Sequence, residues 1–261
     1  MLASALLRSS AAVLALSLFT TFAAAQAQRA PKAFEPEVGQ AGKDVVWVPT
    51  PQAVVDKMLD MAKVTKDDFL MDLGSGDGRT VITAAKRGAR ALGIEYNPDM
   101  VELSKHNAEA AGMTARAQFQ KADLFQTDFS KASVITMFLL PDINLKLRPK
   151  LLRLKPGTRI VSNTFTMGEW QPDETATVEQ GCDGSWCNVL FWIVPAKVSG
   201  AYRIPQGELT LKQSFQMLSG TLASGGRIVP VEGKVRGDEI FLTAGSQSLR
   251  GKVNGRIIEM H

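Results

Sequence analysis

The stretch Phe69-Leu-Met-Asp-Leu-Gly-Ser-Gly-Asp-Gly-Arg-Thr80 sets the architecture of this chain. It begins with a short apolar run typical of a buried strand, passes through glycines at alternate positions, and ends where a helical pattern begins. The pattern predicts a strand over 69–73, a turn over 74–78 and a helix from Arg79 to a stop at Gly88. Because glycines let a ligand approach the backbone and the helix start offers free N–H groups, we expect a binding site here.

The glycine spacing distinguishes between two kinds of nucleotide ligand. A dinucleotide loop has the spacing G-x-G-x-x-G, whereas this loop has G-x-G-x-G and follows Asp72 at the end of a strand. A carboxylate there would repel a pyrophosphate but suits the amino group and sulfonium of S-adenosylmethionine. Glu95 ends the next predicted strand, where it can accept hydrogen bonds from both ribose hydroxyls. Asp123 follows a third strand, where it or its neighbours can bind the adenine amino group.

Length and composition fit an ordinary globular protein with one α/β domain and a smaller unit. The 261 residues are 45% apolar and 21% charged, and the formal net charge is +4. Lysine and arginine are scattered rather than clustered, so no nucleic-acid-binding surface is evident. A solvated basic surface is the better interpretation.

The first 27 residues have the pattern of a secretory signal peptide. Arg8 precedes an uncharged apolar run from Ala11 to Ala25, and small residues over 23–27 offer a cleavage site. The run is short for a membrane span, so no stable span is expected after cleavage. An organelle-targeting peptide is the rival interpretation, which the uninterrupted apolar run disfavours. We therefore predict an exported protein, periplasmic or secreted, with a flexible lead-in over 28–44.

Predicted strands and helices alternate from residue 45 to residue 196. Thr50 as N-cap and Pro51 as first helical residue predict a helix start, and the corner over 48–51 either folds over the cofactor or simply enters the helix. Pro149 is expected to split a later helix into two turns. Further strands are predicted over 91–95, 115–122, 133–140 and 158–165, and a hairpin over 175–179 and 188–194. The fold class is therefore α/β, a doubly wound and mainly parallel sheet with an antiparallel edge hairpin.

A small C-terminal unit is predicted over 197–261, where helical periodicity disappears. Ten of the 22 glycines lie in this unit, and the octapeptide from Gly233 to Ile240 recurs in similar form from Gly251 to Ile258. The pattern predicts a β-meander or a small barrel-like unit. We interpret the repeat as similar hairpins that need similar turns, without a role in ligand binding.

The two cysteines, Cys182 and Cys187, lie at the expected tip of the edge hairpin. In an exported chain, two cysteines so placed most simply form a disulfide. Zinc is disfavoured because the only histidines, His106 and His261, are distant in sequence. We therefore predict a disulfide and no metal.

Several motifs together resemble a known family. The stretch 72–80 with Glu95 and Asp123-Leu-Phe125 resembles the class I, seven-stranded, S-adenosylmethionine-dependent methyltransferases. More narrowly, two groups are similar: the mitochondrial lysine methyltransferases acting on the ATP synthase c-subunit and the adenine nucleotide carrier, and the non-SET histone lysine methyltransferases. The motifs of this narrower resemblance are Val48-Pro-Thr-Pro51, Asp72-Leu-Gly-Ser-Gly-Asp-Gly-Arg79, Glu95-Tyr-Asn-Pro98 and Leu154-Lys-Pro-Gly-Thr-Arg-Ile-Val-Ser162. The resemblance covers roughly residues 45 to 195.

The resemblance implies roles for particular residues. Those expected to bind the cofactor are Asp72, Gly74, Ser75, Gly76, Asp77 and Gly78 at the methionine end, Glu95 at the ribose, and Asp123 and Leu124 at the adenine. Acceptor-binding residues are expected after the fourth strand, with Phe138, Pro141, Asn144 and Trp170 as candidates. The sequence there is Leu139-Leu-Pro-Asp142 rather than the Asn-Pro-Pro-Tyr type of many amino methyltransferases. That departure leaves the acceptor and the catalytic residues unassigned.

Two functions follow as hypotheses. The first is methyl transfer from S-adenosylmethionine to an unidentified acceptor, with protein lysine as a candidate. The second is an exported, non-catalytic binding or scaffold protein that retains the fold, because S-adenosylmethionine is made in the cytoplasm. An unused pocket would normally lose its acidic residues, so the presence of Asp72 and Glu95 favours the enzyme.

Overall fold

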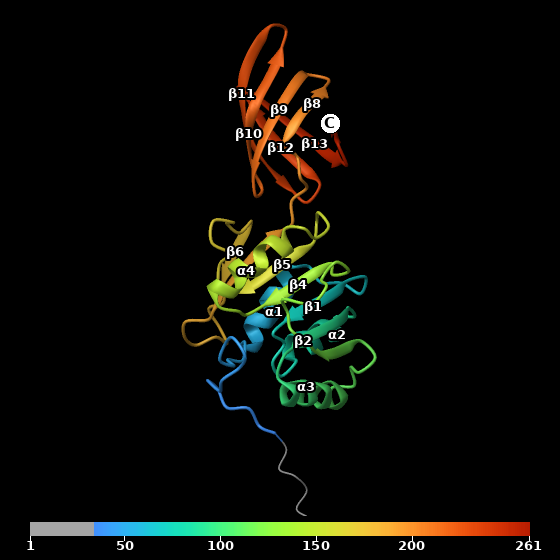
Figure 1. The fold of residues 1–261 in the computed structure, drawn as a ribbon, viewed down its shortest axis with the longest axis vertical. Helices are drawn as coiled ribbons and strands as arrows, with labels where there is room; N and C mark the ends of the chain where they lie inside the picture. The colour runs from blue at the N-terminus through green and yellow to red at the C-terminus, as the bar shows by residue number, and fades with distance from the viewer. Residues whose placement is uncertain (1–33) are drawn as a thin grey trace, which may run out of the picture. The chain divides into compact units, whose positions relative to one another are not determined.

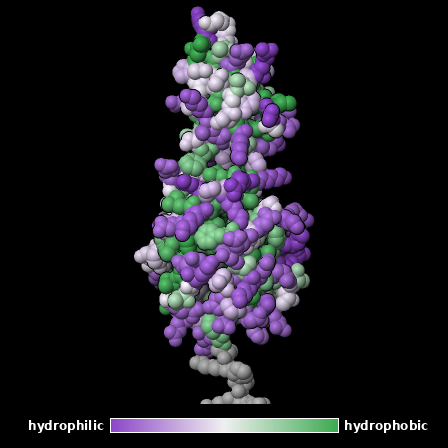
Figure 2. All heavy atoms as spheres, viewed as in Figure 1, coloured by the Kyte–Doolittle hydropathy of each residue, from purple (hydrophilic) through white to green (hydrophobic). Residues whose placement is uncertain are grey.

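A computed structural model describes residues 34–261 of the chain. The signal peptide expected over 1–27 and the first part of the lead-in lie outside the described residues. Within 34–261, no helix is both long and apolar enough to cross a membrane. Figure 1 shows the elements, and Figure 2 shows hydrophilic side chains interspersed with apolar ones over one face.

The first sheet has seven strands in the order β3-β2-β1-β4-β5-β7-β6 (Figure 1). Strands β1 to β5 pair in parallel, and β7 runs antiparallel to both β5 and β6. The strands are β1 (Phe69–Leu73), β2 (Arg90–Glu95), β3 (Ala117–Lys121), β4 (Val134–Met137), β5 (Arg159–Asn163), β6 (Glu174–Thr177) and β7 (Asn188–Ile193). The predicted fold class, a mainly parallel sheet with an antiparallel edge hairpin, is confirmed.

Helices cover both faces of this sheet: α1 (Gln52–Met61), α2 (Arg79–Lys86), α3 (Pro98–Ala110) and α4 (Pro141–Leu151). Helices α1, α2 and α3 contribute Val54, Val81 and Val101 to one apolar core. Helix α4 contributes Ile143 and Leu147 to a second core on the other face. Because neighbouring strand residues point to opposite faces, each buried strand supplies side chains to both cores.

Two local predictions about helices were wrong. Thr50 does not cap α1: Pro51 has extended backbone angles and takes the N-cap position, and its carbonyl accepts the N–H groups of Val54 and Val55. Pro149 lies inside α4 without splitting it. Its missing N–H would have paired with the carbonyl of Leu145, so the helix continues with one hydrogen bond fewer.

The second sheet is an antiparallel meander in which β8 to β14 pair in chain order. The strands are β8 (Gly200–Ile204), β9 (Gly207–Ser214), β10 (Met217–Ser224), β11 (Arg227–Arg236), β12 (Glu239–Ala244), β13 (Gln247–Asn254) and β14 (Ile257–Met260). The meander encloses its own apolar core, and it matches the β-rich C-terminal unit of the predicted fold class.

The repeated glycines of the meander lie where neighbouring strands approach closely. A Cβ on Gly233 would lie 2.0 Å from the carbonyl oxygen of Phe241, and one on Gly251 would lie 2.5 Å from that of Glu259. Any side chain there would displace the adjoining backbone. The repeat therefore has a structural explanation in the packing of the strands.

The predicted disulfide between Cys182 and Cys187 is present, with the two Cα atoms 5.8 Å apart. It closes the loop between β6 and β7. The base of that loop is fixed by a 2.9 Å hydrogen bond from the Val178 N–H to the Cys187 carbonyl. Both cysteines are buried in the same core as α1, so the disulfide attaches the edge hairpin to the rest of the sheet.

Candidate functional site

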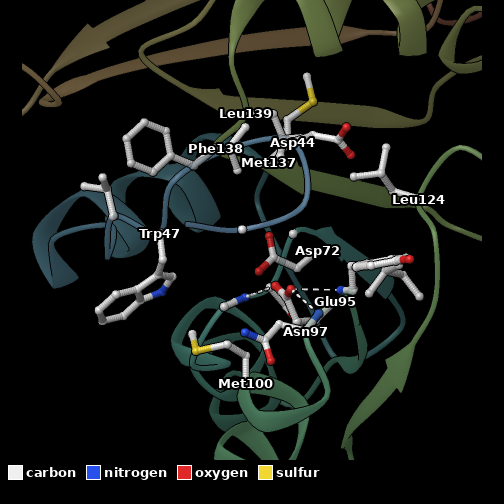
Figure 3. Close-up of a pocket in the computed structure, with 18 of the residues that line it drawn as sticks. Asp44, Trp47, Asp72, Glu95, Asn97, Met100, Leu124, Met137, Phe138 and Leu139 are labelled. Atoms are coloured by element: carbon white, nitrogen blue, oxygen red, sulfur yellow. Dashed lines mark hydrogen bonds between the residues drawn. The ribbon is translucent and has the colours of Figure 1, made fainter. Parts of the chain in front are cut away.

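A cavity of about 250 Å³ lies at the carboxyl ends of β1, β2 and β4. In open α/β sheets, ligands bind beyond this edge, where connections leave the strands in opposite directions. Figure 3 shows the carboxylates of Asp72 and Glu95 pointing into the same space, with Trp47 and Met100 on one side and Leu124 on the other. The sheet topology thus brings together acidic residues from two neighbouring strands.

Asp72 is a buried carboxylate on β1. Its Oδ1 accepts a 2.6 Å hydrogen bond from the Thr136 hydroxyl on neighbouring β4. Burial first, and then the charges of Glu95 and Asp77, raise the pKa of Asp72 to about 7, against the single hydrogen bond from Thr136. The described residues give Asp72 no ion-pair partner, so a cationic ligand group would restore its charge.

Glu95 holds the glycine loop in place. Its Oε2 accepts the N–H of Gly76 at 3.0 Å, and its Oε1 accepts those of Tyr96 at 2.8 Å and Asn97 at 2.9 Å. Gly76 has a φ of 54°, and a Cβ on it would lie 2.7 Å from Nε1 of Trp47. Only glycine fits this position, because both the backbone angle and the space exclude a side chain.

The other loop residues have different environments. Gly74, Ser75 and Asp77 line the cavity, whereas Gly78 does not. Asp77 is paired with Arg79, whose Nη2 lies 2.6 Å from its Oδ2. The Oγ of Ser75 is buried and has no hydrogen-bond partner among the described residues. An unpaired buried hydroxyl beside a cavity fits a polar ligand that would complete it.

Asp123 and Leu124 line the far side of the cavity, as expected of the adenine end. The Asp123 side chain is engaged by the protein itself. Nζ of Lys43 lies 2.7 Å from its Oδ2, and the hydrogen bond from Lys43 holds the pKa of Asp123 below its usual range. The same ammonium lies 4.7 Å from the centre of the Tyr96 ring. Leu124 thus provides apolar surface on which a flat base can lie.

The end of the lead-in and the segment before α1 form a wall of the cavity. From the sequence, a place over the cofactor was one of two interpretations of the corner over 48–51, and residues 40–47 were given no role. Residues 40–50 all line it, including the Val48–Thr50 part of the proline-containing corner. Two backbone hydrogen bonds fold this segment back on itself, from Gly39 N–H to the Trp47 carbonyl at 2.8 Å and from Trp47 N–H to the Gln40 carbonyl at 2.9 Å. A tryptophan within an apolar run just before the first helix was the available signal.

The acceptor candidates divide into two groups. Phe138 lines the cavity, whereas Pro141, Asn144 and Trp170 do not. Asn144 is buried, and its Nδ2 donates to the carbonyls of Phe165 and Thr166, each at 3.2 Å. Trp170 is fully buried in the core. Two aromatic residues that the sequence did not single out, Phe165 and Trp186, line the cavity beside Phe138.

Comparison with known proteins agrees with this geometry. A family model described as the ANTKMT methyltransferase domain matches residues 72–174. A protein-lysine N-methyltransferase of Saccharolobus islandicus is 48% identical over 140 residues, which is 52% of this chain and 87% of that protein. The lysine N-methyltransferase of mouse that is named for the ATP synthase c-subunit is 36% identical over 141 residues, 54% of this chain and 56% of that protein.

A solved structure is also similar over part of the chain. The RNA methyltransferase of Salinibacter ruber, crystallised with S-adenosyl-L-homocysteine, is 47% identical with a TM-score of 0.54. The match covers 58% of this chain and 96% of that one. With the sheet order and the acidic cavity, these findings define an S-adenosylmethionine-dependent methyltransferase. The chain belongs to the family of the Saccharolobus protein-lysine N-methyltransferase, most of whose length it covers.

The site fits the cofactor of this family. The uncompensated Asp72 carboxylate suits the cofactor's amino group, and Glu95 retains acceptor capacity toward ribose hydroxyls beyond the N–H groups it binds. The family relationship and the retained acidic residues do not favour the alternative of a non-catalytic scaffold.

Proposed function

We propose that this methyltransferase modifies the side-chain amine of lysine in a protein acceptor. The observation that carries the proposal is the charge of the cavity lining. Its two basic side chains are already paired, Lys43 with Asp123 at 2.7 Å and Arg79 with Asp77 at 2.6 Å. The acidic residues of the lining are Asp44, Asp72, Asp77, Glu95 and Asp123, of which Asp77 and Asp123 are the partners of these two basic side chains. Such a lining favours a cationic acceptor over the phosphates of an RNA, which need unpaired lysines and arginines.

The relatives support this choice without deciding it. Those from Saccharolobus and mouse are named for protein lysine, whereas the Salinibacter relative is named for RNA. Two relatives of nearly equal identity thus differ in the acceptor class for which they are named. The cavity lining, which belongs to this chain, is therefore the better guide.

The residues have separate tasks in the proposed reaction. Asp72 would hold the amino end of the cofactor, Glu95 its ribose, and Leu124 its base. The cofactor supplies a methyl group already activated by its sulfonium, so alignment and exclusion of water can provide most of the rate. A lysine must lose its proton before it attacks, and removal of the amine from water in the cavity would lower its pKa.

We also infer that the protein is exported, as the signal-peptide pattern over 1–27 predicts. A disulfide between Cys182 and Cys187 is typical of an oxidising compartment and supports this inference. Mass spectrometry of the native protein should find an N-terminus near Gln26 or Gln28. An intact Met1 or Leu2 in the cytoplasm would contradict export. It would also remove the difficulty of supplying S-adenosylmethionine outside the cytoplasm.

Radiolabelling tests the acceptor class directly. The purified protein is incubated with methyl-labelled S-adenosylmethionine and an extract of cells that lack its gene, and the products are treated with ribonuclease or with protease. The expected label resists ribonuclease and appears as methyllysine after acid hydrolysis. Asp72→Asn serves as the control with impaired cofactor binding. Label released by ribonuclease would contradict the proposal in favour of RNA, and no label would contradict methyl transfer to either class.

A further inference from the structure

Three aromatic side chains form one wall of the cavity. They come from separate segments: Phe138 follows β4, Phe165 follows β5, and Trp186 lies in the disulfide-closed loop. The rings of Phe138 and Phe165 are stacked at 5.9 Å between centroids, and Trp186 is tilted against both, at 5.9 and 5.4 Å. We name these three residues the aromatic corner. Figure 3 shows Phe138 across the cavity from Leu124, so the corner lies away from the expected adenine end.

The disulfide fixes the position of Trp186. This residue directly precedes Cys187, and both cysteines are buried in the core that includes α1 and β7. Trp186 is 39% exposed, so part of its surface is unoccupied by protein. A large apolar side chain held rigidly at the mouth of a cavity loses little conformational entropy when a ligand binds. The loop lies beyond residues 72–174, the range that the family model matches.

Phe165 is held by a strained turn at the end of β5. Thr164 before it has a φ of 62°, a conformation that costs energy for a β-branched residue. The carbonyl of Phe165 accepts hydrogen bonds from the Ser162 hydroxyl at 2.7 Å and from Asn144 Nδ2 at 3.2 Å. The surrounding structure thus fixes a conformation that the turn alone would avoid, and it directs this ring to the corner. Asn144 is a positioning residue for Phe165.

We propose that the aromatic corner binds the acceptor side chain and that Trp186 determines acceptor specificity. The inference rests on the proposed function. Aromatic faces attract an ammonium and pack against the aliphatic stem that carries it. A methylated ammonium keeps its positive charge, so the corner would also hold a partly methylated lysine for a further transfer.

The test compares variants of the full chain in the radiolabelling assay, with the same cell extract as the source of acceptor. Trp186→Ala should lower the initial rate of methyllysine formation about tenfold or more. Trp186→Phe should recover part of the loss because it restores an aromatic face. Ile228→Ala, at an exposed site on β11, is the matched control and should leave the rate unchanged. Calorimetry with S-adenosylhomocysteine should give dissociation constants within about twofold of the parent for all three.

Reduction tests the role of the disulfide in the same assay. A dithiol reagent donates two electrons to the S–S bond, which yields two cysteine thiols and the oxidised cyclic reagent. Treated parent and Cys182→Ser/Cys187→Ser should both lose lysine labelling while they still bind S-adenosylhomocysteine.

Trp186→Ala with an undiminished rate, or with cofactor binding lost together with the rate, would overturn the inference. Failure of the parent to label lysine would instead refute the proposed function, so the two failures are distinguishable.

Discussion

Replacement of Asp72 by asparagine should separate the stability of the empty protein from its ability to bind the cofactor. Asparagine keeps the shape of the side chain and can still accept the hydrogen bond from Thr136, which is 2.6 Å long in the parent. It cannot carry the negative charge that a cationic ligand requires. The change therefore removes one property, the buried charge, and leaves the packing in place.

The size of the effect follows from the pKa. Burial first, and then the charges of Glu95 and Asp77, raise the pKa of Asp72 from 3.8 to about 7 in the folded protein. At 1.36 kcal/mol per pKa unit, the ionised carboxylate costs the empty fold about 4 kcal/mol. The protonated carboxyl has no such cost. Because the folded pKa is raised, the empty parent has its full stability below pH about 4 and loses about 4 kcal/mol of it as the pH rises through 7. Above pH 7, Asp72→Asn should therefore stabilise the empty protein by up to this amount.

Cofactor binding should respond in the opposite sense. Below pH 7 the empty site is protonated, so binding of a cation must release a proton from Asp72. The parent's affinity for S-adenosylmethionine should rise about fivefold from pH 6 to pH 7. It should fall again above about pH 8, where the α-amino group of the ligand loses its charge. Asp72→Asn should bind weakly, without the rise between pH 6 and pH 7.

Calorimetry across pH and thermal melts of the cofactor-free protein measure the two effects. An Asp72→Asn variant with the parent's affinity and pH slope would refute the assignment of Asp72 to the cofactor's amino group. A parent melting temperature that does not fall relative to the variant between pH 5 and pH 8 would refute the raised pKa.

Further predictions concern the glycine loop and the disulfide. Glu95→Gln should weaken S-adenosylmethionine binding at least about tenfold, because neutral acceptors hold N–H and ribose donors less tightly; an unchanged dissociation constant at native circular dichroism would contradict its role. Gly78→Ala, at a φ of 82° with a Cβ 2.7 Å from an aromatic ring, should cost more unfolding free energy in urea than Gly112→Ala, whose φ is 67° with no atom within 4 Å. Equal losses of unfolding free energy would show that the aromatic ring moves aside without loss of stability. Cys182→Ser/Cys187→Ser should fold and lose at most about 3 kcal/mol, because the closed loop is short. Thiol titration of the unreduced, denatured parent should find no free thiols.

The cofactor end of the site could be predicted from the sequence because it is built from local patterns. The glycine loop marks the end of one strand, and Asp72 and Glu95 end consecutive parallel strands. The parallel topology then brings the two carboxylates to one edge of the sheet without further information. The details of helices beside prolines were less well predicted. The cap at Thr50 was wrong because capping depends on backbone angles that the residue types do not fix, and the expected break at Pro149 is absent.

The residues of the acceptor end could not be predicted from the sequence in the same way. Phe138, Phe165 and Trp186 are separated by tens of residues and lie in loops, where no periodicity marks which side chains meet. Trp170 was the more prominent candidate in sequence, yet it is fully buried in the core. The three-dimensional arrangement selects Trp186 because the disulfide and the order of β5, β7 and β6 carry its loop to the cavity.

The cofactor end is built at strand ends and the acceptor end in loops, and this difference affects how the acceptor can change within the family. The residues expected to hold the cofactor lie at strand ends and in a glycine loop that allows little variation. The aromatic corner is assembled from loops, and one of its members depends on a disulfide outside the range matched by the family model. A relative can therefore keep the cofactor site and still present a different surface to its acceptor. Relatives of 48% and 47% identity are indeed named for different acceptor classes, protein lysine and RNA. The lining of the acceptor end, rather than overall identity, should thus predict which molecule is methylated.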